Sequence, residues 1–421
     1  MAKLVPKVRV ITADETLEKT RREIRYQLDH NPVITFYMIL VVTVLLAGIG
    51  LLMVFSASSI SGLTNRHAPL ITFLKPATYC IVGLFCMWVA SRANIRLLLN
   101  LKVARGILLV AIVLQCLVVP FGANIGGNRN WIYLFGFSFQ PSEPLKLAMI
   151  IYLAALLGRR RVDFDSWSDM AKQLALPVGG SVAVVLLGRD MGTAIVFLLI
   201  AFAMLFVCGL PAKKIWHITL PALFLVAVLV ARSPSRRARI LTFLPFMPKD
   251  AQGIDMQEIR SKWGLGTGGL TGVGPGASRQ KWNFLPQADS DFIFAILGEE
   301  FGLVGTLSVI TLYVLLAIAL VRLARRCKEY PVVVLSYGTL AWIEFQALIN
   351  IAVVVGISPV IGVPLPFISS GGSALLSCLM GMGVMLACAK RENGAYQILA
   401  RKPSLIRKTL AVVGNRKKEV E

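Results

Sequence analysis

Carboxylates and basic side chains stand inside or beside long apolar runs at several places in this chain. Ionisable residues are costly at membrane depth and are functional candidates by default. Glu143 and Lys146 stand at the start of one apolar run, just after Gln140, and their spacing puts both on one helix face where they can pair. From the residues alone, this pair either lines a ligand site or only orients two helices.

Two further groups border apolar runs. Arg129 and Trp131 lie in the polar stretch 122–143, where an arginine beside an aromatic ring predicts a phosphate contact at the outer membrane interface. Plain aromatic anchoring is the alternative. Asp190 lies in a charged break, 188–194, between two apolar runs. Irregular backbone at that depth is tolerated only where it lines protein or a water-filled cavity, although a tight outer turn would also explain it.

Asp291 stands where a basic, glycine-rich segment, 233–290, meets a long apolar run. A carboxylate that is partly desolvated but close to cations can serve as a general base, and it can also cap the following helix. Asp289 lies two residues earlier, and two close carboxylates raise the pKa of one of them, which suits a base. Further on, Ser370, Gly371 and Gly372 follow a proline-rich stretch. This pattern predicts a kinked loop that forms part of a cavity wall.

The elements that must position these groups are apolar runs of spanning length. More than half of the 421 residues are apolar (56%) and the mean hydropathy is +0.71, so the chain needs lipid as its solvent. The fold expected is an all-α polytopic membrane protein with about ten transmembrane helices. The runs cover 34–56, 70–91, 105–121, 144–157, 173–187, 191–208, 215–232, 291–320, 331–356 and 372–389.

Loop charges predict the orientation. Lys and Arg gather before the first run, in every second connection and after the last run, so both chain ends are expected in the cytoplasm. The expected organisation is a cytoplasmic tail (1–33), a ten-helix membrane domain (34–390) and a basic cytoplasmic tail (391–421). The long outward loop 233–290 breaks the rule because it is basic, with Lys281 among its cations. This loop predicts an anionic, lipid-linked phosphate ligand, with attraction to lipid head groups as the alternative.

The same composition argues against several functions. A net charge of +22 does not predict nucleic-acid binding, because the basic residues do not form a face on a folded polar module. The seven cysteines occur singly and the three histidines lie far apart, so neither a metal site nor a disulfide framework is expected. A cleavable signal peptide is not expected either, because about thirty mostly polar residues precede a first run of spanning length.

Taken together, residues 34–390 resemble the SEDS family of bacterial cell-wall polymerases, the FtsW/RodA proteins. The segments 140–146, 286–294 and 364–373 carry the resemblance in this order. The segments 276–282 and 296–300 are more similar to the division type, FtsW, than to the elongation type, RodA, whereas 364–366 is closer to RodA. The expected fold is therefore a SEDS-type bundle with one long extracytoplasmic loop, and the FtsW type is favoured.

The resemblance implies a multi-pass enzyme of the bacterial plasma membrane at the division septum. It would be an inverting peptidoglycan glycosyltransferase that polymerises lipid II, with a class B penicillin-binding protein and other division proteins as partners. The residue matching Asp291 is essential in the family, and those matching Glu143 and Lys146 line the same cavity. No cofactor is required with certainty, and a divalent cation (Mg or Mn) is left open. A lipid II flippase, a RodA-type polymerase and a non-enzymatic division scaffold are the alternatives.

The chain departs from the family pattern at three places. Members usually carry His-Thr where this chain has Asp289 and Ser290, a tyrosine where it has Ser370, and Gln/Glu-Pro where it has 188–189. The resulting hypothesis makes Asp291 the base for the acceptor hydroxyl. In this hypothesis Lys146, oriented by Glu143, holds the donor pyrophosphate together with Arg129 and the basic loop.

Overall fold

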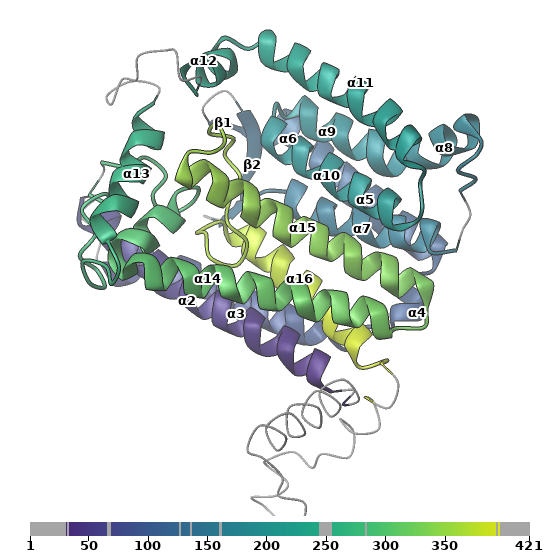
Figure 1. Cartoon of the computed structure of the whole chain (residues 1–421), viewed down its shortest axis with the longest axis horizontal. Helices are drawn as coiled ribbons and strands as arrows, with labels where there is room; N and C mark the ends of the chain where they lie inside the picture. The colour runs from purple at the N-terminus through teal and green to yellow at the C-terminus, as the bar shows by residue number, and fades with distance from the viewer. Residues whose placement is uncertain are drawn as a thin grey trace, which may run out of the picture.

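The computed structural model describes residues 31, 33–64, 69–125, 128–134, 137–159, 162–243, 255–282, 284–392 and 395. The two tails expected at 1–33 and 391–421 therefore lie almost wholly outside the described residues. The helices run side by side in one bundle (Figure 1). In chain order, the elements are α2 (Ile34–Thr64), α3 (Pro69–Ala90), α4 (Ile95–Leu98), α5 (Leu101–Cys116), α6 (Val118–Phe121), β1 (Ala123–Ile125), β2 (Asn128–Leu134), β3 (Phe137–Phe139), α7 (Ser142–Leu157), α8 (Trp167–Leu174), the π-helix η1 (Ala175–Gly180), α9 (Ser181–Leu187), α10 (Met191–Val207), α11 (Ala212–Ala231), α12 (Pro234–Phe243), α13 (Met256–Gly268), α14 (Ile293–Arg326), α15 (Tyr330–Val355) and α16 (Gly372–Ala389).

Each of the ten apolar runs coincides with a helical segment, which confirms the expected fold class. Among the described residues, eight helical segments are long and apolar enough to cross a membrane. The other two runs correspond to α10 and α7, of 17 and 16 residues. The structure also contains two features that the sequence did not predict. The polar stretch 122–143 holds a small antiparallel sheet of order β1-β2-β3, and the long loop 233–290 contains α12 and α13.

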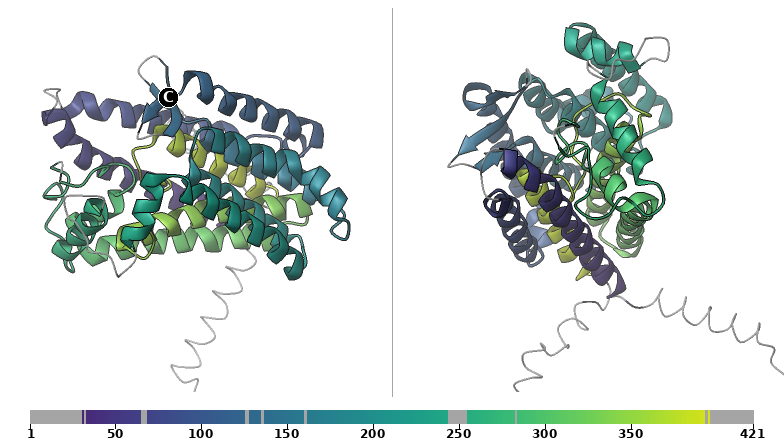
Figure 2. Two further views of the ribbon diagram at one scale, coloured as in Figure 1. Left: turned by 90° about the horizontal axis from the view of Figure 1, so that it is seen from above. Right: turned by 90° about the vertical axis from the view of Figure 1, so that its left-hand side faces the viewer.

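Helix α7 is the centre of the bundle. All of its residues except Pro144 are buried, and it packs against α5, α15 and α16. Around it, α16 packs on α3 and α2, while α14 packs on α2 and α15 (Figure 2). Because α7 touches protein on all sides, it can carry Glu143 and Lys146 without exposing either charge to lipid.

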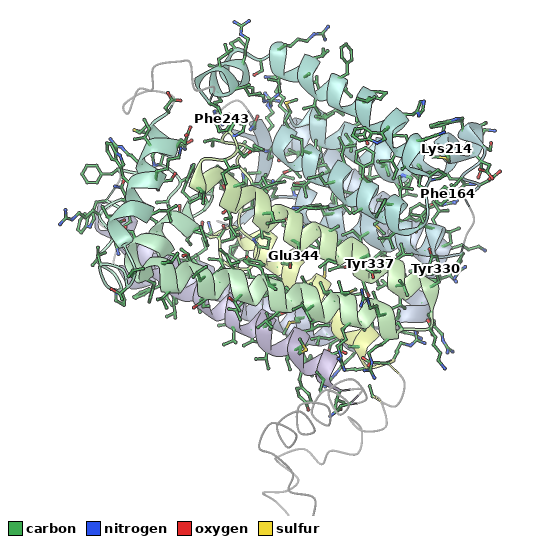
Figure 3. All side chains as sticks on the ribbon, viewed as in Figure 1. Phe164, Lys214, Phe243, Tyr330, Tyr337 and Glu344 are labelled. Atoms are coloured by element: carbon green, nitrogen blue, oxygen red, sulfur yellow. The ribbon has the colours of Figure 1, made fainter. Side chains whose placement is uncertain are left out.

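Helix α11 lies at the edge of the bundle, with α10 and α12 as its main neighbours. Near its first turn, Lys214 donates to the carbonyl oxygens of Phe164 and Asp165 in the connection before α8. The helix runs from this anchored end toward α12, which ends at Phe243 on the opposite side of the molecule (Figure 3). This arrangement carries α12 to the sheet end of the bundle.

Helix α13 and the segment that follows it are fastened to the start of α14 by Glu299, which is buried. Its carboxylate accepts hydrogen bonds from the hydroxyl of Ser278 and from the backbone N–H groups of Arg279 (3.0 Å) and Gln280 (3.2 Å). A Cβ at Gly268 would overlap the backbone of α14, so the two helices meet backbone to backbone at this glycine. The segments 276–282 and 296–300, noted separately in the sequence, thus form one structural unit.

Glu300 adds a buried ion pair to this unit. Its Oε1 accepts from Lys281 Nζ at 2.8 Å and from the hydroxyl of Ser56, on α2, at 2.7 Å. Both charged side chains are at most 3% exposed. Removing one partner of such a pair leaves the other charge buried without compensation, which costs far more than the pair contributes as a whole.

We therefore expect Glu300→Ala to destabilise the protein strongly, by about 3–5 kcal/mol, because Lys281 would remain buried without its counter-ion. The measurement is thermal unfolding of the purified protein in detergent. Arg391→Ala is the matched control, since the Arg391–Glu329 pair joins side chains that are 29% and 46% exposed and should contribute less than about 1 kcal/mol. Equal melting temperatures for the two variants would contradict the assignment.

Candidate active site

A cavity of about 630 Å³ opens at the sheet end of the bundle. Its wall is formed by β2 and the residues after it, the first turns of α10, the second half of α11, and α12. The segment 287–291 and the loop 359–371 complete most of the wall. The two α11 residues in this wall, Val226 and Val230, are apolar. The polar and charged residues that line it are Asn128, Asn130, Tyr133, Ser138, Gln140, Asp190, Arg236, Arg239, Gln257, Gln287, Asp289, Ser290, Asp291 and Ser370.

Asp291 lies on a tight turn that immediately precedes α14. Gln287 has a φ of 59°, in the left-handed region, and its carbonyl accepts the N–H groups of Ser290 and Phe292. Non-glycine residues in this region are uncommon and cluster at functional sites. The helix begins at Ile293 and its N-cap position is Phe292, so Asp291 does not cap it. The carboxylate is therefore left available to the cavity.

Two residues fix the backbone around Asp291 to the proline-rich loop. The side-chain amide of Asn350, on α15, donates 2.8 Å hydrogen bonds to the carbonyl oxygens of both Asp291 and Val363. The hydroxyl of Ser369 donates to the carbonyl of Ser290 at 2.7 Å. These bonds satisfy backbone carbonyls that helix geometry cannot satisfy, and they place Asp291 in a defined position.

The surroundings of Asp291 raise its pKa to about 6. Burial is the main cause, because removal from water penalises the charged form. The negative charges of Asp289 and Asp190 act in the same direction, and Arg239 opposes them. The expectation that Asp289 raises the pKa of its neighbour is thus confirmed in direction. A carboxylate with this pKa is mostly ionised at neutral pH yet basic enough to accept a proton.

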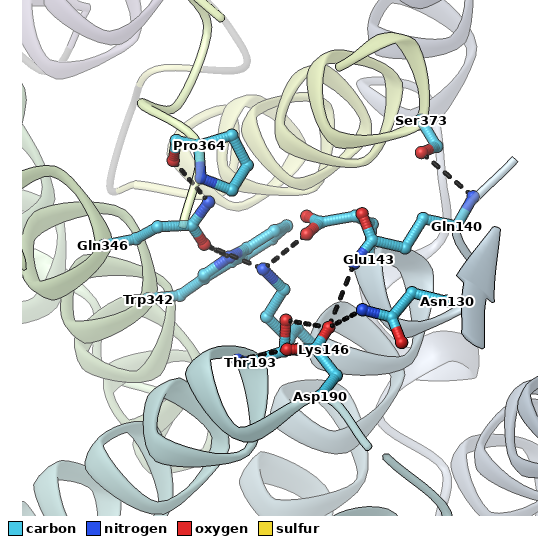
Figure 4. Close-up of polar contacts among 10 residues, drawn as sticks. All are labelled: Asn130, Gln140, Glu143, Lys146, Asp190, Thr193, Trp342, Gln346, Pro364 and Ser373. Atoms are coloured by element: carbon cyan, nitrogen blue, oxygen red, sulfur yellow. Dashed lines mark hydrogen bonds and ion pairs between the residues drawn. The ribbon is translucent and has the colours of Figure 1, made fainter. Parts of the chain in front are cut away.

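Asp190 closes the cavity on the side of α10, where it is the N-cap of that helix. Its carboxylate accepts from the backbone N–H of Thr193 at 3.0 Å and from the hydroxyl of the same residue at 2.7 Å. Asn130 and Gln140 also donate to it, at 2.9 and 3.4 Å (Figure 4). Burial raises the pKa of Asp190, and the bonds from Thr193 and the charge of Lys146 reduce the shift. The sequence predicted a charged break here, and the structure adds the cap.

Glu143 and Lys146 form an ion pair of 2.9 Å, each only 1% exposed, and neither lines the cavity. Lys146 Nζ also donates to Gln346 Oε1 at 2.8 Å, and the amide of Gln346 donates to the carbonyl of Pro364 at 3.0 Å (Figure 4). The indole N–H of Trp342 donates to the same Gln346 oxygen. The pair therefore contacts the cavity wall through Gln346, and its predicted contact with substrate stays a prediction.

The other predicted residues divide between the cavity and its surroundings. Trp131, Gln140, Ser370 and Gly371 belong to the cavity wall, as Asp190 and Asp291 do. Three others lie elsewhere. Arg129 has an exposed side chain that donates to the carbonyl of Val119, Lys281 is held in the pair with Glu300, and Gly372 packs against the ring of Tyr79.

Two cavity-lining cations come from α12. Arg236 and Arg239 line the wall, and Arg236 donates to the carbonyl of Arg189 and, at 3.4 Å, to Asn128. Burial lowers the pKa of Arg236, and the charge of Asp190 opposes this shift. The sequence placed both arginines in the basic loop but gave no reason to distinguish them from the other cations there. Their spacing of three on a helix that follows α11 is the signal that could have done so.

The divalent cation left open by the sequence has no ready-made protein cage. Among the described residues, no group of three or more His, Cys, Asp or Glu side chains is close enough to hold a metal ion. Mg²⁺ is often bound by few protein ligands together with substrate phosphates, and such a site needs no cage of protein side chains.

Fold and site define a polytopic helical membrane protein with an acidic and cationic cavity at one end of its bundle. The chain belongs to the FtsW/RodA/SpoVE family of cell cycle proteins, whose family model matches residues 36–394. A probable peptidoglycan glycosyltransferase FtsW from Geobacter sp. (strain M18) is 34% identical over 359 residues, which cover 85% of this chain and 97% of that protein. A probable FtsW from Coxiella burnetii is 36% identical over 366 residues, covering 84% and 96%.

Solved structures agree with this family. One match is a chain from a structure titled "Structural coordination of polymerization and crosslinking by a peptidoglycan synthase complex". It has a TM-score of 0.68 and 27% identity to this chain, and the match covers 84% of this chain and 97% of that one. The rod shape determining protein RodA of Thermus thermophilus matches with a TM-score of 0.62 and 26% identity, covering 84% and 96%. The predicted resemblance is thereby confirmed.

The geometry predicts a carboxyl group that titrates near pH 6. In infrared titration of the protein in detergent, the wild type should show a protonated-carboxyl signal that disappears as the pH rises through about 6. Asp291→Asn should lack this component. Identical titrations of wild type and variant would show that Asp291 has no raised pKa.

Proposed function

We propose that this chain is a peptidoglycan glycosyltransferase that polymerises lipid II into glycan strands during septal wall synthesis. Its family and the names of its relatives support the enzyme class and the division type. The observation that carries the chemistry is the position of Asp291. A carboxylate with a pKa of about 6 shares one cavity with Arg236 and Arg239. A base and cations in one site are what transfer from a pyrophosphate-linked sugar requires.

In the proposed reaction, Asp291 accepts the proton of an acceptor sugar hydroxyl as its oxygen attacks the anomeric carbon of the donor. The new C–O bond forms while the bond from that carbon to the pyrophosphate oxygen breaks, and the electron pair leaves with the polyprenyl pyrophosphate. Attack and departure on opposite faces invert the anomeric centre. Arg236 and Arg239 stabilise the leaving pyrophosphate, because arginine donates paired hydrogen bonds to phosphate oxygens.

The ion pair Glu143–Lys146 supports this reaction from behind the wall. Lys146 holds Gln346, and Gln346 holds the carbonyl of Pro364 in the loop on which the Asp291 segment rests. In this role the pair positions the loop, and the two arginines of α12 are the cations of the cavity wall that contact the leaving pyrophosphate. The positive charge of Lys146 also acts on Asp190, where it opposes the rise in pKa that burial causes.

The proposed setting is the bacterial plasma membrane at the division septum, with ten spans and both chain ends in the cytoplasm. In this organisation 34–390 forms the membrane domain, 233–290 the extracytoplasmic loop, and 1–33 and 391–421 the tails. A class B penicillin-binding protein is the proposed partner, supported by the likeness to a chain of a peptidoglycan synthase complex. Lipid II, other division proteins and the membrane complete the proposed contacts.

We expect Asp291→Asn to lose lipid II polymerisation by at least about a hundredfold, because a positioned base typically contributes 10²–10⁴-fold. The measurement is gel analysis of glycan strands made from purified lipid II, with the partner transpeptidase present. The variant should insert and melt like the wild type, since Asp291 does not cap α14.

The same variant separates the alternatives. A flippase needs no base at this position. If Asp291→Asn loses polymerisation but still supports lipid II transport that depends on the chain, the two roles are separate. Wild-type glycan synthesis by the variant would remove Asp291 from the mechanism.

The two arginines give a second expectation. Arg236→Ala should reduce kcat/KM for lipid II by roughly 10- to 100-fold, the equivalent of one or two charged hydrogen bonds. Arg236→Lys should reduce kcat/KM by a smaller factor than Arg236→Ala does. Arg237→Ala is the control, because this neighbour on α12 is exposed and does not line the cavity. Equal effects at both positions would indicate a general effect of loop charge.

A further inference from the structure

Asp289 is a second carboxylate in the wall of the cavity that holds Asp291. Its side chain has a fixed orientation, because the hydroxyl of Ser370 donates to Asp289 Oδ2 at 3.1 Å. The backbone N–H of Ser370 also donates to the carbonyl of Asp289 at 3.0 Å. Two bonds from one residue thus hold both the backbone and the carboxylate of Asp289 against the proline-rich loop.

Asp289 and Ser370 are also two positions at which the resemblance given in the sequence analysis implies other residues, histidine and tyrosine. The two positions are 81 residues apart in the chain and in contact in the structure. At this contact a small hydroxyl holds a negative charge.

The charged groups that face Asp291 come from three elements. Asp289 lies on the same segment, Asp190 reaches the cavity from the start of α10, and Arg236 and Arg239 reach it from α12. The loop 357–371 has no ionisable side chain, and α15 contributes the neutral amide of Asn350. After burial, Asp289 is the largest influence that raises the pKa of Asp291, ahead of Asp190. Its removal should therefore have the largest effect of any single charge.

We propose that Asp289, oriented by Ser370, is a positioning residue that sets the pH range in which Asp291 accepts the proton of the acceptor sugar. The proposal rests on the proposed function. A carboxylate at this position makes Asp291 a stronger base than it would be beside a neutral or positive side chain. With Asp289 present, the reaction is faster once Asp291 is ionised. On acidification, however, activity is lost at a higher pH than it would be with a neutral or positive side chain at position 289.

The test is the pH dependence of lipid II polymerisation from pH 4.5 to 8. Asp289→Asn keeps the shape and an acceptor for Ser370 but removes the charge. It should move the acidic limb of the profile down by about one pH unit and lower the plateau a few-fold, because Asp291 becomes a weaker base. Ser370→Ala, which keeps the charge and frees its orientation, should move the limb in the same direction by less. Asp289→His with Ser370→Tyr should move it at least as far as Asp289→Asn.

Asp165→Asn is the matched control, since it removes one negative charge from a side chain that is 99% exposed and does not line the cavity. Its profile should equal that of the wild type. An unchanged acidic limb in Asp289→Asn, or one moved to higher pH, would overturn the proposal.

Infrared titration gives a readout that does not need turnover. In Asp289→Asn, the component assigned to Asp291 should titrate about one pH unit lower than in the wild type. An Asp289→Asn variant in which this component titrates as in the wild type overturns the proposal. Failure of the proposed function gives a different result, because Asp291→Asn would then polymerise lipid II whatever the profile of Asp289→Asn.

Discussion

Backbone without helical hydrogen bonds is expensive beside a membrane, and the segment 287–291 has such a backbone. It persists because the proline-rich loop and α15 supply the missing partners: Asn350 for the carbonyl of Asp291, Ser369 for that of Ser290, and Ser370 for that of Asp289. The rest of the site depends on this contact between two irregular segments. It allows a carboxylate to stand free of the helix that follows, at the cavity and at a fixed place.

The buried polar residues below the cavity support the same contact. Trp342, Gln346 and Asn350 are spaced by four along one face of α15. Gln346 connects the Glu143–Lys146 pair to the carbonyl of Pro364, and Asn350 connects Val363 to Asp291. The ion pair is thus joined to the proposed base through amides and backbone alone. This arrangement explains how charges that do not line the cavity can still matter to it.

Much of the fold could be predicted because lipid imposes a simple rule: long apolar runs become helices, and all ten runs did. Asp291, Asp190 and Ser370 could be chosen as candidates because each interrupts or borders such a run, but only the structure shows that they share one cavity. The sheet at 123–139 could not, since three short strands leave no periodic signal of their own. The burial of Lys146 could not either, because its partner Gln346 lies 200 residues away. Spacing revealed that Lys146 can pair with Glu143 but not that neither side chain reaches the cavity.

That separation of 200 residues has a consequence for how the protein is made. Helix α7 is 16 residues long, about 24 Å, which is short of a typical 30 Å hydrocarbon layer, and it carries two charges at its first turns. During synthesis it enters the membrane long before α15 and α16 exist to cover it. Its early neighbour is α5, against which it packs in the finished bundle. The central helix of the protein is thus the one least able to stay in a membrane alone, and its final burial must wait for the last helices to leave the ribosome.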